Sequence, residues 1–202
     1  MDLNGRKTIF LDVGGVLLTN GWDHPARQKA ADHFDLDFTK MDALHNFIFN
    51  VYEIGQITLN EYLDTVVFNQ PRGFTHKEFK EFMFAQSEEL PQLIPWLVNW
   101  KKQTRHRIIS INNEGKELND HRVQKFKLRD CFDAFISSCE VGMRKPDPGI
   151  FRLALGVAQT KAKDSIYFDD RPMLVSSAAT LGIQALLHEG FEQTKSILEN
   201  LA

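Results

Sequence analysis

The fold is best predicted from a segment near the start of the chain, Thr8-Ile9-Phe10-Leu11-Asp12-Val13-Gly14-Gly15. Its first four residues form a short apolar run, which predicts a buried strand, and the two glycines predict a turn directly after it. A carboxylate, Asp12, stands where the predicted strand ends. Further apolar runs predict four more strands, at residues 107–111, 134–137, 165–168 and 183–187.

Longer amphipathic segments lie between and after the later strands and predict helices. They span residues 117–128, 148–158, 172–181 and 191–201. Short buried strands that alternate with helices are typical of parallel sheets, so we expect an α/β fold with a Rossmann-like parallel sheet core. In such a sheet, ligands bind beyond the carboxyl ends of the strands.

The segment from about residue 22 to residue 89 has a different pattern. It lacks β-branched strand runs and contains two capping-box signatures, Thr58-Leu59-Asn60-Glu61 and Thr75-His76-Lys77-Glu78. We therefore expect an insert of three to five helices, which gives a core of residues 1–20 and 91–202 and an α-helical cap of residues 21–90. The aromatic residues of the insert recur at helical spacing, which favours a hydrophobic core of its own, although some of them could line a substrate cavity.

The overall composition disfavours several classes of protein. The chain has 202 residues, 43% of them hydrophobic and 25% charged, and a net charge of −3, which argues against disorder and against dedicated nucleic-acid binding. No apolar run reaches the roughly 20 residues that span a bilayer, and residues 1–5 begin no apolar leader. Cys131 and Cys139 are too few for a disulfide framework. We expect a cytoplasmic protein with no nucleic-acid or membrane partner.

Polar residues stand at or just beyond the ends of four predicted strands, and the carboxyl ends of parallel strands share one edge of a sheet. Carboxylates that meet there would repel one another. A hard divalent cation resolves this conflict, and Mg²⁺ prefers a few carboxylates together with water and a substrate phosphate. A lysine supplies a point charge for the same phosphate. These residues are Asp12, Ser110, Asn112, Asn113, Lys145, Asp169 and Asp170.

The order of these motifs resembles that of the haloacid dehalogenase-like hydrolase superfamily. The matching segments are Phe10-Leu11-Asp12-Val13-Gly14-Gly15-Val16, Gly142-Met143-Arg144-Lys145-Pro146-Asp147 and Tyr167-Phe168-Asp169-Asp170-Arg171-Pro172. Each match is weak alone, whereas the ordered set is specific and covers essentially the whole chain. The resemblance is greatest to the phosphatase branch that contains sugar-phosphate phosphatases, whose members carry an α-helical cap where this chain has its insert.

The resemblance implies a Mg²⁺-dependent phosphatase that acts on a small phosphorylated metabolite, such as a sugar phosphate. By this resemblance, Asp12 would attack phosphorus and form an aspartyl-phosphate, which divides one difficult displacement into two easier ones. The metal would be held by the Asp12 carboxylate, the Gly14 carbonyl and Asp170, with Asp169 acting directly or through water.

The resemblance also implies a phosphate-binding set. Lys145 would neutralise charge on the transferring phosphoryl group and steady Asp12. Ser110 has the residue type that the family's Ser/Thr motif requires, but the spacing to the following Phe132-Asp133 favours Asn112. We therefore place Asn112 in this role, with Asn113 beside it.

Gly14 departs from the family pattern. Most phosphatases of the superfamily carry a second aspartate at this position, which acts as general acid and base. General acid catalysis is typically worth about 10²–10⁴-fold in rate. We therefore expect an enzyme that favours good leaving groups, or one that takes a proton from Asp23, His24 or another residue of the cap.

Each of these residues also has a purely structural interpretation. Asp12 could cap the turn before the glycines, and Asp170 could cap the helix that begins near Pro172. Lys145 could be a solvated loop residue, and Ser110 a small residue in a buried strand. Chemistry is favoured because the polar signals occur together, at the ends of successive strands and in the order of one family.

Three other functions fit parts of the pattern. A phosphoacceptor receiver domain uses similar residues but places its acidic pair first, whereas Asp169-Asp170 comes last here. A 2-haloacid dehalogenase uses the same aspartate attack without a metal, and the acidic pair would hinder its carboxylate substrate. A catalytically weak or non-enzymatic protein of the same fold, which binds a phosphorylated ligand, is favoured by Gly14. The sequence specifies neither the substrate nor the oligomeric state.

Overall fold

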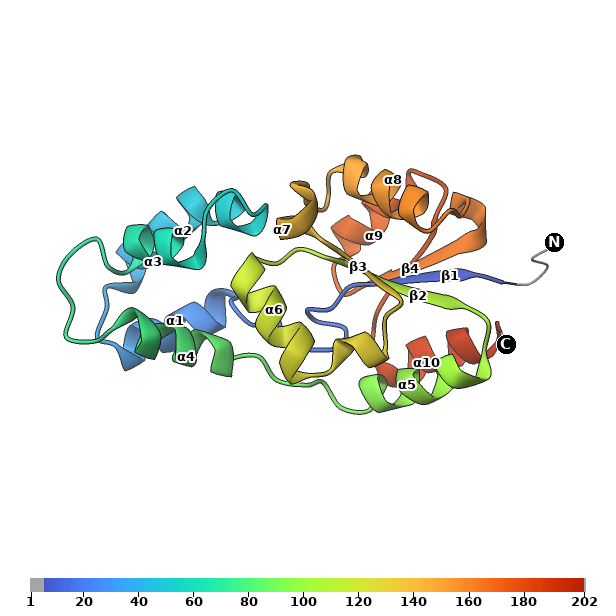
Figure 1. Ribbon diagram of the computed structural model, residues 1–202, viewed down its shortest axis with the longest axis horizontal. Coiled ribbons are helices and arrows are strands. Elements are labelled where there is room, and N and C mark those ends of the chain that lie inside the picture. The colour runs from blue at the N-terminus through green and yellow to red at the C-terminus, as the bar shows by residue number, and fades with distance from the viewer. Residues whose placement is uncertain (1–5, 202) are drawn as a thin grey trace.

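A fully parallel five-stranded sheet forms the centre of the computed structural model, which describes residues 6–201 (Figure 1). The strand order is β3-β2-β1-β4-β5. Residues 1–5, on which the expectation about a leader rests, lie outside the described residues. All five predicted strands are confirmed, each to within one residue at either end. The strands are β1 (Thr8–Leu11), β2 (Arg107–Asn112), β3 (Ala134–Ser137), β4 (Ser165–Asp169) and β5 (Gln184–Leu187).

Helices cover both faces of the sheet (Figure 1). The four helices predicted for this part of the chain are confirmed, and each ends earlier than predicted. The helix predicted over residues 117–128 ends at Lys125, before a 3₁₀ turn, η1 (Leu128–Asp130). No helix among residues 6–201 combines the length and the apolar character needed to cross a membrane. One face carries α5 (Leu93–Gln103), α6 (Lys116–Lys125) and α10 (Phe191–Glu199), and the other carries α8 (Pro148–Val157) and α9 (Pro172–Ala179).

The strands are buried on both faces, which is why they appear in the sequence as continuous apolar runs. In β1, Ile9 and Leu11 pack into the cluster that includes Leu97 of α5 and Leu198 of α10. Phe10, between them, points to the opposite face and packs with residues of α8 and α9. Because side chains alternate between the two faces of the sheet, the same pattern determines toward which face the first residue after each strand points.

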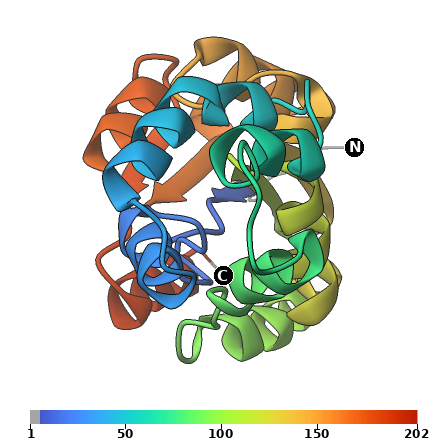
Figure 2. The ribbon, with the colours of Figure 1, turned by 90° about the vertical axis from the view of Figure 1, so that its left-hand side faces the viewer.

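Four further helices form a separate group at the carboxyl ends of the strands (Figures 1 and 2), and we call this group the helical unit. Both predicted capping boxes are present, at Thr58 with Glu61 and at Thr75 with Glu78. The aromatic side chains of the unit build a hydrophobic cluster apart from the two that flank the sheet, as their spacing predicted. The helices are α1 (His24–His33), α2 (Phe38–Glu53), α3 (Leu59–Val66) and α4 (His76–Ala85).

The two chain segments that join the helical unit to the sheet run side by side. The Thr19 N–H donates to the Glu88 carbonyl at 2.9 Å, and the Leu90 N–H donates to the Leu17 carbonyl at 2.9 Å. This pairing lies close to both predicted limits of the cap. The assignment of residues 21–90 as a cap remains a prediction, which we use in the functional proposal below.

The contact between α2 and the start of α6 leaves room for glycine alone. A Cβ atom added at Gly115 would lie 2.0 Å from Cε1 of Tyr52, a fully buried side chain at the end of α2. The backbone of Gly115 (φ −70°, ψ 151°) suits any residue. Glycine is therefore required at position 115 because the helical unit and the core pack closely there, and not because of its backbone conformation.

Gly115→Ala should therefore destabilise the protein by about 1–3 kcal/mol, the usual cost of overpacking a buried contact. Urea denaturation followed by circular dichroism measures this change. The matched control is Gly156→Ala in α8, where an added Cβ meets nothing within 4 Å. That substitution should be neutral or stabilise by up to about 1 kcal/mol, since alanine favours a helix interior. Equal stabilities of the two variants would contradict this account of the junction.

Candidate active site

Three carboxylates converge at the carboxyl edge of the sheet. Asp12 follows β1, Asp169 ends β4 and Asp170 follows it, and one oxygen from each lies within 4.8 Å of the other two. The convergence follows from the parallel register of β1 with β4, in which Leu11 lies opposite Phe168. The structure thus brings together the acidic residues that the sequence placed at strand ends.

Lys145 bridges two of these carboxylates. Its Nζ is 2.7 Å from Oδ2 of Asp169 and 3.0 Å from Oδ1 of Asp12, and its side chain is 1% exposed. It also donates to the Tyr167 hydroxyl at 3.0 Å. The alternative of a solvated loop lysine is therefore wrong for this residue.

Asn113 fixes the loop that carries the lysine. Its Nδ2 donates to the Lys145 carbonyl at 2.9 Å, and its Oδ1 accepts from the Lys145 N–H at 2.8 Å. Because both ends of the amide are used in this way, the side chain of Asn113 positions Lys145. Its predicted contact with phosphate stays a prediction.

Asn112, and not Ser110, lines the cavity in front of the carboxylates. Asn112 is the last residue of β2, whereas Ser110 lies deeper in the strand, fully buried, and its hydroxyl has no hydrogen-bond partner among residues 6–201. This position fits the expectation that Asn112 fills the phosphate-binding role. The interpretation of Ser110 as a small residue in a buried strand fits its surroundings.

Asp170 is not the helix cap that the structural interpretation suggested. Helix α9 begins at Pro172 with Arg171 at the N-cap position, and no side chain caps it. Oδ1 of Asp170 is buried and has no hydrogen-bond partner in the part of the chain that the structure describes. A buried carboxylate oxygen without a partner is costly, so this atom points to a ligand supplied from outside the chain.

Gly15 allows Asp170 to approach the turn after β1. A Cβ atom at Gly15 would lie 2.1 Å from Oδ2 of Asp170, and the backbone has a φ of +71°, which favours glycine. Gly14 is less restricted, because a Cβ there would meet only the flexible end of Asn20, at 2.9 Å from Oδ1. The second glycine of the motif is thus required by geometry, and the first tolerates a side chain.

The chemistry of the cluster fits a hard divalent cation. Carboxylate oxygens are the ligands that Mg²⁺ prefers, and an open site leaves room for water and a phosphate. The three aspartates provide such oxygens within a small volume, and Oδ1 of Asp170 lacks a partner. Oδ1 of Asp169 already accepts from the Arg171 N–H at 2.9 Å and its Oδ2 binds Lys145 and Tyr167, so Asp12 and Asp170 are the freer of the three.

Burial shifts the pKa values of the two freer carboxyl groups in the same direction. It raises the pKa of Asp12 to about 6, while Lys145 opposes the rise and Asp169 adds to it. Burial and the neighbouring Asp169 raise the pKa of Asp170 as well. A cation bound between them would favour their ionised forms, so metal binding would offset the cost of burying these negative charges.

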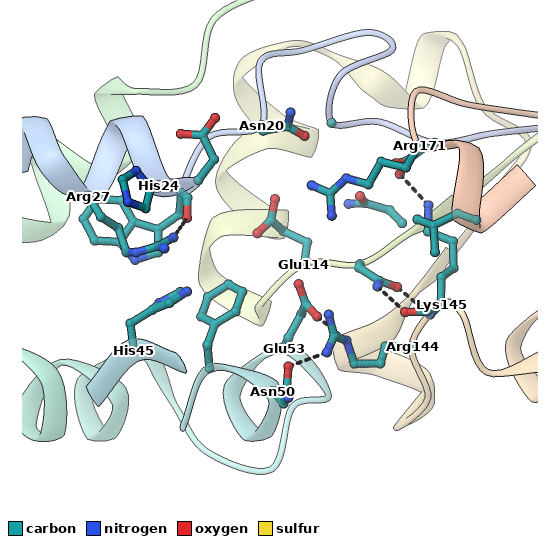
Figure 3. A pocket seen from close by; sticks show the side chains of 18 of the residues that line it. Asn20, His24, Arg27, His45, Asn50, Glu53, Glu114, Arg144, Lys145 and Arg171 are labelled. Atoms are coloured by element: carbon teal, nitrogen blue, oxygen red, sulfur yellow. Dashed lines mark hydrogen bonds and ion pairs between the residues drawn. The ribbon is translucent and has the colours of Figure 1, made fainter. Parts of the chain in front are cut away.

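A cavity of about 430 Å³ lies between this cluster and the helical unit (Figure 3). Its core side presents Asp12, Lys145 and Arg171, and its opposite side presents His24 and Arg27 of α1. Asp23 and His24, the proton sources expected from the sequence, both line it. Such a volume suits a small ligand.

Several residues of the site were not predicted from the sequence. Tyr167 had a detectable signal, because residues two apart on a strand face the same way and it precedes Asp169 by two. Glu114 lines the cavity, but no motif marks it, and Arg144 stands in the motif before Lys145 without a role assigned to it. Glu53 and Arg144 come together only through the fold, as an ion pair with 2.5 Å between Oε2 and Nε.

Comparison with known proteins gives one family. The sequence model of the haloacid dehalogenase-like hydrolases matches residues 6–182. A drimenol cyclase of Aspergillus calidoustus is 27% identical over 200 residues, which are 96% of this chain and 36% of the cyclase. The chain spans at most 36% of the length of the curated relatives it matches.

Three solved structures share the fold. A haloacid dehalogenase family enzyme of Bacteroides thetaiotaomicron superposes with a TM-score of 0.81 at 21% identity, over 96% of this chain and 98% of that one. The same enzyme in complex with magnesium and inorganic phosphate gives a TM-score of 0.77 at 20% identity, over 94% and 98%. An L-2-haloacid dehalogenase gives 0.63 at 14% identity, over 88% and 82%.

Magnesium should stabilise the protein through Asp170. At about 100 times its Kd, a ligand that binds only the folded state adds about 2.7 kcal/mol, which corresponds to roughly 5–10 °C in Tm for a chain of this size. Asp170→Asn should remove most of this rise, and the control Asp120→Asn, an exposed position on α6, should keep it. Thermal denaturation with and without Mg²⁺ measures the effect.

The metal-free stability of Asp170→Asn provides a second readout with the opposite sign. Folding raises the pKa of the Asp170 carboxyl group, so its ionised form is less stable in the folded protein than in the unfolded chain. The group therefore lowers the free energy of unfolding most at a pH above its folded pKa. At pH 7 without metal, Asp170→Asn should therefore be at least as stable as the wild type. An equal Mg²⁺-dependent rise in the two proteins would exclude Asp170 as a ligand.

Proposed function

Because the chain belongs to the haloacid dehalogenase-like hydrolase family, we propose that this hydrolase is a magnesium-dependent phosphatase that acts on a small phosphorylated metabolite through an aspartyl-phosphate. The observation that carries the proposal is the position of the Asp12 carboxylate, 3.0 Å from Nζ of Lys145 and beside Asp169 and Asp170. This arrangement supplies a nucleophile, a cation for the phosphoryl group and a set of metal ligands at one edge of the sheet.

The residues of the chain divide the work of phosphoryl transfer. Asp12 is held by Lys145 and by the Val13 N–H, which donates to its Oδ1 at 2.8 Å, so one carboxylate oxygen is fixed and the other can attack phosphorus. Asp12, the Gly14 carbonyl and Asp170 would hold Mg²⁺, which neutralises phosphate charge when bound. Positioning and charge neutralisation of this kind provide most of the catalysis in phosphoryl transfer.

The residues of the helical unit that line the cavity favour a small polar substrate. Residues of α1 and α2, among them His24, Arg27 and Asn46, form the wall opposite Asp12, so we propose that residues 21–90 act as the cap. A cap that closes over the site excludes water and helps to set specificity. Polar and aromatic groups on this wall favour a sugar phosphate within the proposed class.

Dehalogenation is the second candidate function, because an L-2-haloacid dehalogenase shares the fold of this protein. A 2-haloacid substrate carries its own carboxylate. Among residues 6–201, Lys145 is the one cationic side chain that forms an ion pair with the aspartates of the site, and it is already shared between Asp12 and Asp169. This charge balance favours a phosphate accompanied by a divalent cation over an organic anion alone.

Wild-type protein should hydrolyse 4-nitrophenyl phosphate in the presence of Mg²⁺ and lose this activity in EDTA. Asp12→Asn should reduce the rate by more than about 10³-fold, since removal of a nucleophile affects the whole catalytic unit. Phosphate release measures both effects, and halide release from chloroacetate provides the parallel assay for dehalogenation. EDTA-insensitive halide release would favour the dehalogenase, and equal phosphate release with and without Mg²⁺ and in Asp12→Asn would favour a binding protein.

Gly14→Asp should increase the rate on esters with poor leaving groups. A carboxyl group at this position can donate a proton to the departing oxygen, and general acid catalysis is worth about 10²–10⁴-fold when the acid is well placed. The substitution is sterically mild, because only the end of Asn20 must move. The rate on an alkyl phosphate measures the gain, and unchanged rates on poor leaving groups would contradict the role assigned to Gly14.

A further inference from the structure

Glu114 is a buried carboxylate that faces the cavity from the core. It lies two residues beyond the end of β2 and one residue before the N-cap of α6, and its side chain is 5% exposed. Two contacts hold it in place: its N–H donates to Oγ of Ser138 at 2.9 Å, and its Oε2 accepts from Nη1 of Arg122. Arg122 is itself buried and also donates to the Thr19 carbonyl.

The other oxygen of Glu114 remains available. Oε1 has no protein hydrogen-bond partner among residues 6–201. Figure 3 shows the carboxyl group directed toward the middle of the cavity, between the side that carries Lys145 and Arg171 and the side that carries His24 and Arg27. A carboxyl group anchored through one oxygen and open through the other is suited to exchange a proton with a ligand in the cavity.

The reaction proposed above lacks a proton donor at the usual place, because Gly14 has no side chain. Asp23 and His24 are less suitable. Oδ1 of Asp23 accepts from the Ala26 N–H at 2.9 Å as the cap of α1, and the His24 ring packs edge-on against Phe38 with 5.0 Å between ring centroids. Both belong to the far wall, whereas Glu114 lies between that wall and the side that carries Lys145 and Arg171 (Figure 3).

We propose that Glu114 is the general acid and base of this enzyme. The inference rests on the proposed phosphatase function. In the first step, Asp12 attacks phosphorus while the ester P–O bond breaks, and the departing oxygen takes the bonding electrons and a proton from Glu114. In the second step, Glu114 takes a proton from water as the water oxygen attacks the aspartyl-phosphate, which releases inorganic phosphate and restores the Asp12 carboxylate.

The charges around Glu114 suit both steps. Burial raises its pKa to about 7, Arg122 from α6 opposes the rise, and Glu53 at the end of α2 and Asp12 after β1 add to it. A carboxyl group with such a pKa is protonated in part at neutral pH, so it can give a proton and take one back. Arg122 then stabilises the carboxylate that remains after the first step.

The experiment compares two leaving groups in the holoenzyme with Mg²⁺: 4-nitrophenyl phosphate, whose phenolate needs no proton, and 2-glycerophosphate, whose alkoxide does. Glu114→Gln should reduce kcat on 2-glycerophosphate by about 10²–10³-fold and change kcat on 4-nitrophenyl phosphate by less than about 5-fold. The ratio of the two rates does not depend on the fraction of folded protein, so a loss of stability cannot produce the result.

Three further variants make the test specific. Asp42→Asn removes a carboxylate that pairs with Arg27 on the wall of the same cavity, and its ratio should stay that of the wild type. Glu114→Asp, which keeps a carboxyl group on a shorter side chain, should give an intermediate ratio. In the double variant Gly14→Asp/Glu114→Gln, the new carboxyl group should recover at least 10-fold of the lost rate on 2-glycerophosphate.

The inference is overturned if Glu114→Gln slows both esters equally, or if Asp23→Asn or His24→Asn produces the leaving-group effect instead. Either result leaves the phosphatase proposal intact, because the wild type would still release phosphate in a Mg²⁺-dependent way. Failure of the wild type to hydrolyse either ester would instead overturn the phosphatase proposal, and this inference with it.

Discussion

One ammonium group holds the carboxyl edge of the sheet together. Nζ of Lys145 contacts Asp12 and Asp169 within 3.0 Å, and all three side chains are almost fully buried. Two carboxylates this close, in a medium of low dielectric constant, repel each other strongly. Removal of one partner from a buried charge network of this kind typically costs 3–5 kcal/mol, because the remaining charges are left uncompensated. The candidate site therefore depends on the precise placement of a loop lysine.

That placement has its own support. Asn113, just beyond β2, holds the backbone of Lys145 with both polar atoms of its amide, and the hydroxyl of Tyr167 in β4 accepts a hydrogen bond from the ammonium group. Three neighbouring strands thus contribute to the position of one nitrogen atom. Asp170 lies outside this network, and its Oδ1, which has no hydrogen-bond partner among residues 6–201, is free to bind the metal proposed above.

The sequence predicted the sheet and its polar edge because both depend on local patterns. Each strand is a continuous apolar run, and parallel strands bring the residues at their carboxyl ends to one edge, so Asp12, Asp169 and Asp170 could be grouped before the fold was known. Helix α5 was missed although Leu93, Leu97 and Trp100 form a buried helical stripe. Pro95 stands at its third position, where proline is tolerated in the first turn of a helix but resembles a break in the sequence.

The contacts between the walls of the cavity could not be predicted, because they join segments far apart in the chain. Arg144 precedes Lys145 and forms an ion pair with Glu53 at the end of α2, and Oγ of Ser138, which follows β3, donates to the Glu53 carbonyl at 2.6 Å. These contacts tie α2 to the loops that carry the charged cluster, so the position of the helical unit and that of the loop with Lys145 are coupled. Glu114 also binds Ser138, through its backbone N–H, and lies at the centre of this junction. A proton donor there would depend on the contact between the two parts of the protein, whereas an aspartate at position 14 would depend on the core alone.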